Sequence, residues 1–431
     1  MVIAQVSSSI SPKNVWRYGP WLLILIAAVA YYPRFIRFPA GMQMYPQAAY
    51  CLLHGQMLQS CDLGFTYPPL FAFLMLPFEP MPLWLRDIVW YLVSVGATIG
   101  SFKLAETIAR NAVATPLNAV ELYWLRFLSL LLSAKLILAV FENQAYDALV
   151  VLVLLLGLYA LTTGRELRGG AGLAFAAALK ATPLIFLPYL LWRRRFAAAA
   201  AFVVVFFALS LLPDLFFAPA GAGHGYFVTW LREVAGAPFG IDPGGINDAF
   251  WAGANIMNHS LHGAVSLNID ETTQHALNHA MLYAIDAVFI IVVGTLIAMS
   301  PSDRASIAFD GSLLLISMLM LSPMTSRSHY IALLLPYMTV IALGFRDQRT
   351  VNLGRVVLAI SFALVTVSGN DVVGENVTVW AYRHSFMVLG TLVLLIYFAA
   401  LALERSRRDD FAAAPAANRA ALDAGAIHPA E

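Results

Sequence analysis

The residues of this chain that could do chemistry are a few charged and polar side chains set among apolar ones. Lys180 lies within the apolar segment 171–192, where an unpaired ammonium costs at least about 2.5 kcal/mol if the segment is in a membrane. Lys180 therefore needs an anion, and a bound phosphate is one such anion. The alternative is that its stem follows a half-helix and brings the ammonium to the membrane surface.

Arg327 and His329 form a second candidate pair, in the short polar segment 325–329 between two apolar runs. Arg327 can hold an anion, and His329 can orient a hydroxyl group or accept its proton. A plain surface turn is the alternative. Lys135, near one end of its apolar run, is a further candidate for anion binding, whereas Arg126 in the same run is interpreted as an anchor at the membrane surface.

Asn143 and Gln144 directly precede the apolar run 145–162. We interpret them as opening a helix, whose free N–H groups favour an anion. Helix capping by Asn143 explains the same pattern.

The composition indicates which elements must position these side chains. Of the 431 residues, 60% are hydrophobic and 12% charged, whereas about a quarter of an average soluble domain is charged. Apolar stretches long enough to cross about 30 Å of hydrocarbon recur along the chain. Because every backbone polar group in lipid must be bonded internally, these stretches are expected to be helices. The net charge of +1 argues against a nucleic-acid partner.

Arg-rich short segments mark the cytoplasmic side and set the predicted topology. We expect an all-α polytopic membrane protein with about 10 to 12 transmembrane helices. Two apolar segments are not expected to cross: 68–78 should lie along the outer surface, and 171–192, interrupted by prolines, should form two half-helices that enter and leave on the cytoplasmic side. The predicted spans are 21–32, 84–107, 121–140, 145–162, 196–217, 280–300, 308–324, 330–345, 355–369 and 386–403.

This topology predicts a single transmembrane domain over 1–403. Its outer loops 33–83 and 218–279 are long and poor in Lys and Arg, and long loops of this kind usually carry function. Residues 404–431 are expected to be a disordered cytoplasmic tail.

Cys51 and Cys61 are the two cysteines of the chain, and both lie in the first outer loop. In an oxidising compartment a disulfide between them would stabilise the fold by about 2 to 3 kcal/mol. Two free thiols are the alternative.

Several short motifs, in a fixed order and at expected helix ends, resemble those of glycosyltransferase family 87, whose members have the GT-C fold. The resemblance extends to about residue 345. The motifs are Tyr45-Pro46-Gln47-Ala48-Ala49, Leu52-Leu53-His54-Gly55, Phe65-Thr66-Tyr67-Pro68-Pro69-Leu70-Phe71, Asn143-Gln144, Ala178-Leu179-Lys180-Ala181-Thr182-Pro183, Asn258-His259-Ser260-Leu261 and Ser326-Arg327-Ser328-His329-Tyr330.

This resemblance implies a GT-C-like bundle and an enzyme that moves a sugar, such as mannose, from a polyprenyl-phosphate donor to a lipid or glycan acceptor. The leaving phosphate gains charge that cations and N–H groups must stabilise. Tyr67 is expected to fix the entry of a surface helix over the donor, and Asn258 to line the pocket from above. The residues expected to bind the donor are Lys180, Arg327, Lys135, Asn143 and Gln144.

An inverting transfer also needs a base that takes the proton of the acceptor hydroxyl. The family is expected to supply an Asp just before the first motif, but this sequence has Gly41-Met42-Gln43-Met44 there. Asp62, the only acid from 33 to 78, is the candidate base, and a turn residue is its alternative role. His329 is the second candidate, with Glu142 and Asp147 in reserve. If none of them serves, the fold has kept a donor pocket and lost or changed its activity.

A transporter or lipid flippase is the rival interpretation, but no repeated halves are visible in the sequence. An assembly subunit without chemistry is a third. No nucleotide-binding glycine loop is apparent, and no cofactor or metal is expected. The expected partners are membrane lipid, the lipid-linked sugar and the acceptor, at a bacterial inner membrane with the active site facing the periplasm or exterior.

Overall fold

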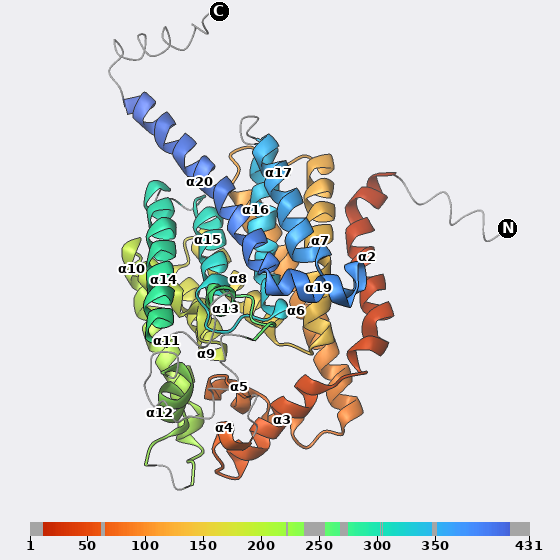
Figure 1. Cartoon of the computed structure of the whole chain (residues 1–431), viewed down its shortest axis with the longest axis vertical. Coiled ribbons are helices and arrows are strands. Elements are labelled where there is room, and N and C mark those ends of the chain that lie inside the picture. The colour runs from red at the N-terminus through yellow and green to blue at the C-terminus, as the bar shows by residue number, and fades with distance from the viewer. Residues whose placement is uncertain are drawn as a thin grey trace, which may run out of the picture.

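The structure is a computed structural model that describes residues 12–61, 65–220, 223–236, 255–267, 275–301, 303, 305–346 and 351–413. Within these ranges every regular element is a helix, as the composition predicts (Figure 1). Each predicted span falls on a helix. The longest helices are α2 (Pro12–Phe35), α6 (Leu83–Asn111), α7 (Ala119–Glu142), α14 (His275–Met299) and α20 (Phe386–Ala413).

Shorter helices fill the space between the long ones. Those of intermediate length are α3 (Ala40–Leu53), α8 (Asp147–Thr162), α9 (Glu166–Leu179), α11 (Phe196–Leu211), α15 (Ile307–Met320), α16 (Leu334–Gly344), α17 (Val351–Ser361) and α19 (Glu375–Arg383). The remaining elements are α4 (Leu58–Cys61), α5 (Pro69–Leu74), η1 (Leu76–Phe78), η2 (Thr182–Ile185), α10 (Phe186–Trp192), η3 (Pro213–Leu215), α12 (Tyr226–Trp230), η4 (Leu231–Ala235), α13 (Leu261–Ser266), η6 (Arg327–Leu333), η7 (Phe362–Val367) and α18 (Asn370–Val373).

In the described part of the chain, 4 helices are long and apolar enough to cross a membrane, and a bent pair of helices raises this to 5. The predicted count of about 10 to 12 is therefore not confirmed. The bent pair is Gly19–Phe35 with Ala40–Leu53, which meet at 70°. Several other predicted spans form apolar helices of 10–17 residues, which at about 1.5 Å per residue are short for the hydrocarbon layer. The chain is an integral membrane protein.

Parts of the two outer loops gather at one end of the bundle, where α3, α4 and α5 lie beside α12 (Figure 1). The Trp230 indole of α12 donates to the Thr66 carbonyl at 3.0 Å, which ties the second loop to the first. Helix α5 begins at Pro69, as predicted, but Leu70 and Phe71 are buried. The segment 68–78 packs against α3 and α12, and its place along the outer face of the membrane remains a prediction.

Segment 166–195 forms a hairpin inside the bundle. Helix α9 ends at Leu179 because the ring of Pro183 would clash with the carbonyl four residues earlier. Lys180 follows in an extended conformation, and η2 and α10 lead back. Arg195 and Glu166 form an ion pair of 2.7 Å, so the hairpin enters and leaves at the same end. This confirms the predicted pair of half-helices, although the first starts at Glu166 rather than 171. The membrane side remains a prediction.

Glycines let the hairpin approach its neighbours closely. A Cβ at Gly157 in α8 would lie 2.8 Å from the backbone nitrogen of Leu173 in α9, and a Cβ at Gly170 would collide with the backbone of Ala198 in α11. Such close contact between small residues is the usual way in which helices associate in lipid. The position of Lys180 is therefore set by tight packing on both sides of α9.

Two further predictions concern the ends of the chain and the first loop. Cys51 and Cys61 are joined as a disulfide, with their Cα atoms 6.3 Å apart. Helix α20 continues to Ala413, so the first part of the predicted tail is helical. Residues 414–431 lie outside the described part of the chain.

Candidate functional site

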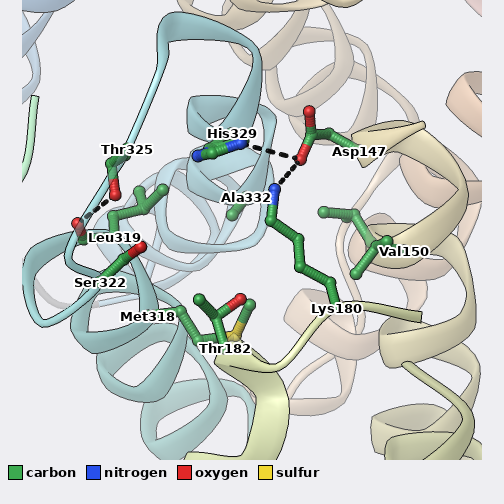
Figure 2. Close-up of a pocket in the computed structure, with 11 residues that line it drawn as sticks. Asp147, Val150, Lys180, Thr182, Met318, Leu319, Ser322, Thr325, His329 and Ala332 are labelled. Atoms are coloured by element: carbon green, nitrogen blue, oxygen red, sulfur yellow. Dashed lines mark hydrogen bonds and ion pairs between the residues drawn. The ribbon is translucent and has the colours of Figure 1, made fainter. Parts of the chain in front are cut away.

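One buried charged group consists of Asp147, Lys180, Ser328 and His329, and we call it the Asp147 cluster. Lys180 Nζ lies 2.5 Å from Asp147 Oδ1, and Ser328 Oγ donates to Asp147 Oδ2 at 2.8 Å. His329 Nε2 lies 3.6 Å from Asp147 Oδ1. The lysine and the histidine both reach the same carboxylate oxygen, Oδ1 of Asp147 (Figure 2). Lys180 thus has the anion that its burial requires, within the protein.

Three separate elements bring these side chains together. Asp147 is the first residue of α8, and Lys180 follows α9, which packs along α8. Because the two helices are similar in length and joined by a short connection, the start of α8 and the end of α9 meet at one level. Ser328 and His329 belong to η6, whose start is fixed by a capping box between Ser326 and His329.

The hydrogen bonds of His329 define which of its nitrogens carries a proton. Nδ1 accepts from the backbone N–H of Ser326 at 3.1 Å, so the neutral ring carries its proton on Nε2, facing Asp147. Burial lowers the pKa of His329 to about 4, with Lys180 acting in the same direction and Asp147 opposing it. His329 is therefore neutral near pH 7 and is set to donate a hydrogen bond from Nε2.

A cavity of about 20 Å³ adjoins the Asp147 cluster (Figure 2). This is room for about one water molecule, so a sugar phosphate can enter only if neighbouring segments move apart. Its walls come from α8, α15, η6 and the hairpin tip. The residues that line it are Asp147, Val150, Val151, Lys180, Thr182, Met318, Leu319, Ser322, Thr325, His329 and Ala332.

An aromatic group connects the Asp147 cluster to the first outer loop. Lys180 Nζ lies 5.5 Å from the centre of the Tyr146 ring, which stacks on Phe71 at 4.2 Å. Tyr67, predicted to bind substrate, lies 4.7 Å from the same ring, and Tyr45 lies 6.0 Å from it. The motif residues of the first loop are thus packed against the start of α8.

Lys135 and Arg327 belong to a second group, which we call the outer charged cluster: Arg34, Lys135, Glu142, Arg327 and Asp371. Lys135 pairs with Asp371 and lies 3.5 Å from Glu142. Arg327 and Lys180, both expected to hold the donor phosphate, therefore point to different clusters on either side of η6. Arg327 donates to the hydroxyl of Tyr382 instead.

The interpretation that Asn143 and Gln144 open a helix is wrong, because Asn143 is the C-cap of α7. Its amide donates to the Ala139 carbonyl. Gln144 is fully buried and adopts a positive φ of 47°. Its side chain accepts from Met42 N at 2.8 Å and donates to Asp87 at 3.0 Å. Gln144 thus joins α3, α6 and the α7–α8 turn, and the backbone N–H groups of Asn143 and Gln144 donate to the carbonyls of Ala139 and Phe141.

The Asn258 side chain has its hydrogen bonds within the protein. Its amide donates to the Pro323 carbonyl at 2.8 Å, and its oxygen accepts from Thr325 N at 3.1 Å and Ser260 Oγ at 2.9 Å. Asn258 does not line the cavity beside Asp147. It holds the segment 323–325, and through it the start of η6, in place.

Of the candidate bases Asp62 and Asp147, the structure describes only the second. Asp62 lies outside the described residues. Asp147, held only in reserve, is the centre of the cluster. The signal that could have found it is the pairing of two antiparallel helices of similar length, 147–162 and 166–179, which places Asp147 opposite Lys180. No sequence signal indicated Arg34 or Asp371.

Comparison with known proteins agrees with this picture. The sequence model of the family described as "Glycosyltransferase family 87" matches residues 65–323. A protein from Mycobacterium tuberculosis named "Polyprenol-phosphate-mannose-dependent alpha-(1-2)-phosphatidylinositol pentamannoside mannosyltransferase" is 26% identical over 292 residues. The protein of the same name from Mycolicibacterium smegmatis is 25% identical over 167 residues.

The matched regions leave much of these relatives uncovered. The first comparison covers 67% of this chain and 60% of the relative, and the second covers 38% of each. The family match includes Asp147 and Lys180 and ends before Arg327. No solved structure matches the chain.

Proposed function

Because the chain belongs to glycosyltransferase family 87, we propose that it is a membrane glycosyltransferase that moves a sugar from a polyprenyl-phosphate donor to a lipid or glycan acceptor. Mannose is the proposed sugar, because both relatives are named as mannosyltransferases that depend on polyprenol-phosphate-mannose. The observation that carries the proposal is the family match over 65–323, which contains the Asp147–Lys180 pair.

In this proposal the Asp147 cluster supplies the N–H groups that hold the donor phosphate. When the glycosidic bond breaks, the donor phosphate gains negative charge. Lys180 can share its three N–H donors between Asp147 and the phosphate, and the Nε2–H of His329 points into the same space. Asp147 then acts as a positioning residue that keeps the lysine charged and aimed.

The base that activates the acceptor hydroxyl is proposed to be Asp62. Asp147 accepts from Lys180 and Ser328, and a carboxylate with such donors is a poor proton acceptor. The Nδ1 lone pair of His329 is occupied by the Ser326 N–H. Support for Asp62 comes from its place directly after Cys61, whose disulfide to Cys51 fixes α4 against α3, and α3 packs on the aromatic group beside Asp147.

The finer architecture is also proposed: a GT-C-like bundle in which the short apolar helices complete the membrane layer. The reaction site then faces the periplasm or exterior of a bacterial inner membrane, because the Arg-bearing ends of the hairpin mark the opposite, cytoplasmic side. A glycolipid with a phosphatidylinositol-type head is the proposed acceptor class, by analogy with the names of the two relatives.

The test is a transfer assay with purified protein in lipid nanodiscs. We expect label from polyprenyl-phosphate [14C]mannose to appear in a new lipid or glycan product when a membrane lipid extract is added. Polyprenyl-phosphate [14C]glucose serves as the matched donor control. If the protein instead moves labelled lipid between the leaflets of sealed vesicles without forming any product, the transporter interpretation replaces the enzyme.

A further inference from the structure

The outer charged cluster joins three elements that are far apart in the sequence. Arg34, near the end of α2, lies 3.2 Å from Glu142 of α7 and 3.3 Å from Asp371 of α18. Lys135 of α7 pairs with the same two acids. Asp371 is thus held by two cations, one on each neighbouring long helix.

The cluster has more positive than negative charge. The cations Arg34, Lys135 and Arg327 face the carboxylates Glu142 and Asp371, and Arg327 forms no ion pair among the described residues. Arg327 Nε is buried and has no hydrogen-bond partner in the described structure.

Arg327 of η6 and Lys135 of α7 approach each other beside Gly369. Arg327 Nη2 and Lys135 Cε lie 3.1 and 3.2 Å from the place where a Cβ of residue 369 would be. Because residue 369 is glycine, both side chains can approach the backbone here more closely than a side chain at 369 would allow. Arg327, which has no carboxylate partner among the described residues, therefore lies close to Lys135, which is already paired with Asp371.

Asp371 reaches the cluster on a short and weakly held element. Helix α18 spans only Asn370–Val373, lies between Gly369 and Gly374, and packs mainly on α19. Gly374 has φ 79° and ψ 167°, a conformation that in practice only glycine adopts. The Asp371 side chain is 43% exposed. An exposed segment with few buried contacts opens at low free-energy cost.

We propose that Lys135, Arg327 and Arg34 form a binding site for the phosphate group of a lipid substrate, and that Asp371 occupies this site until the lipid displaces it. The inference rests on the proposed function, which requires phosphate-bearing lipids. A lipid phosphate, as a diester or a monoester, carries at least one negative charge, so its exchange for the Asp371 carboxylate leaves no cation newly uncompensated. Its oxygens can also reach Arg327, which the carboxylate leaves without an ion pair.

The position of the cluster toward the ends of α2 and α7 also suits the binding of a lipid phosphate. Arg34 is 52% exposed and lies in the last turn of α2, just before the bend into α3. Lys135 and Glu142 lie toward the same end of α7. Phosphate groups of lipids sit at the membrane surface, where cations at helix ends meet them.

The experiment measures equilibrium binding of radiolabelled polyprenyl phosphate, which carries no sugar, to the full-length protein in nanodiscs. Lys135→Gln and Arg327→Gln should each weaken binding by about tenfold, because each removes one charge-assisted contact. Asp371→Asn should strengthen binding by about tenfold, because it removes the internal competitor. Asp371→Glu should bind like the unaltered protein, which shows that the effect follows the charge.

Arg126→Gln is the matched control, because Arg126 is a cation on the same helix whose partner is Glu106 at 2.8 Å. It should leave binding unchanged. Uncharged polyprenol should bind equally to all variants. A parallel series with phosphatidylinositol identifies the source of the phosphate: the lipid whose binding responds to Asp371→Asn is the one that uses the site.

Weaker or unchanged binding of both phosphate lipids in Asp371→Asn, in protein that elutes as the same monodisperse peak, would overturn the proposal and leave Asp371 as a simple structural latch. Sugar transfer is measured in the same nanodiscs. If sugar is transferred but lipid binding does not change in Asp371→Asn, this inference alone is refuted. If lipid binding changes in Asp371→Asn but no sugar is transferred, the proposed function alone is refuted.

Discussion

Lys180 and Asp147 are 33 residues apart in the sequence, yet Lys180 Nζ lies 2.5 Å from Asp147 Oδ1. The contact joins the tip of the hairpin to the start of α8. It anchors the one extended residue of the hairpin between α9 and η2. The ion pair is thus a structural link that also holds the Lys180 ammonium beside the cavity.

Removing one partner of this pair should destabilise the protein strongly. Lys180→Met leaves the Asp147 carboxylate buried with only Ser328 and His329 near it, and breaking a buried pair in this way costs about 3 to 5 kcal/mol. The double variant Lys180→Met/Asp147→Leu should recover most of this loss, since no uncompensated charge remains. Denaturant titration of the purified protein measures both free energies of unfolding.

Lys103→Met is the control, because Lys103 is exposed on α6. It should change the free energy of unfolding little. The double variant should lack transfer activity despite its restored stability. A double variant as unstable as Lys180→Met would contradict the ion pair as the cause.

The second prediction concerns the side of the membrane on which the two ends of the hairpin lie. Arg168 and Arg194 are exposed residues near its two ends, and the Arg195–Glu166 ion pair puts both ends together. In a background with Cys51→Ser and Cys61→Ser, single cysteines at 168 and 194 should react with an impermeant maleimide from the cytoplasmic side only. A cysteine at the exposed Glu375 of α19 should react from the outside. Labelling of 168 and 194 from opposite sides would refute the hairpin.

The helical segments and the break before Lys180 could be predicted because they depend on local properties. Long apolar runs in lipid have to be helices, and Pro183 ends α9 through its own ring. The start of α5 at Pro69 follows from the same kind of local rule. Such features need no knowledge of distant residues.

The partners within each cluster could not be predicted, because they depend on how helices pack. Asp371 meets Lys135 across 236 residues of sequence, and Gln144 meets Asp87 and Met42 from different helices. Burial of α5 likewise depends on α12 settling over the first loop. The sequence pattern marked Lys180 as needing an anion and Lys135 and Arg327 as candidates for binding one, but not which anions they have.

A third prediction is that the protein loses stability as the pH falls below neutral. Burial lowers the pKa of His329 from 6.5 to about 4 and that of His259 from 6.5 to about 3, and both lie in connections between apolar helices. From pH 6.5 downward the unfolded chain takes up protons that the folded protein does not accept until about pH 4. Stability is therefore fully present above 6.5 and declines steadily toward 4.

Thermal unfolding in detergent between pH 7.5 and 4.5 measures this decline. His329→Gln and His259→Gln should each make the melting temperature less dependent on pH, and together they should remove most of the dependence. His54→Gln, at an exposed position in the first loop, is the matched control and should leave the slope unchanged. A slope that survives the double change would show that other groups cause it.

The last prediction separates the two candidate bases. Asp62→Asn keeps the size and shape of the side chain but removes its basicity, so donor binding should persist while kcat falls by roughly a hundredfold or more.

His329→Gln should behave differently. Nδ1 of His329 already accepts the Ser326 N–H, so the ring serves as a donor toward the phosphate, and its loss should raise KM for the donor by about tenfold with a smaller effect on kcat. Measurement of kcat and KM over a range of donor concentrations distinguishes the two patterns. Should Asp62→Asn keep normal turnover while His329→Gln abolishes it at saturating donor, His329 is the base, and its Nδ1 must break the bond to Ser326 during the reaction.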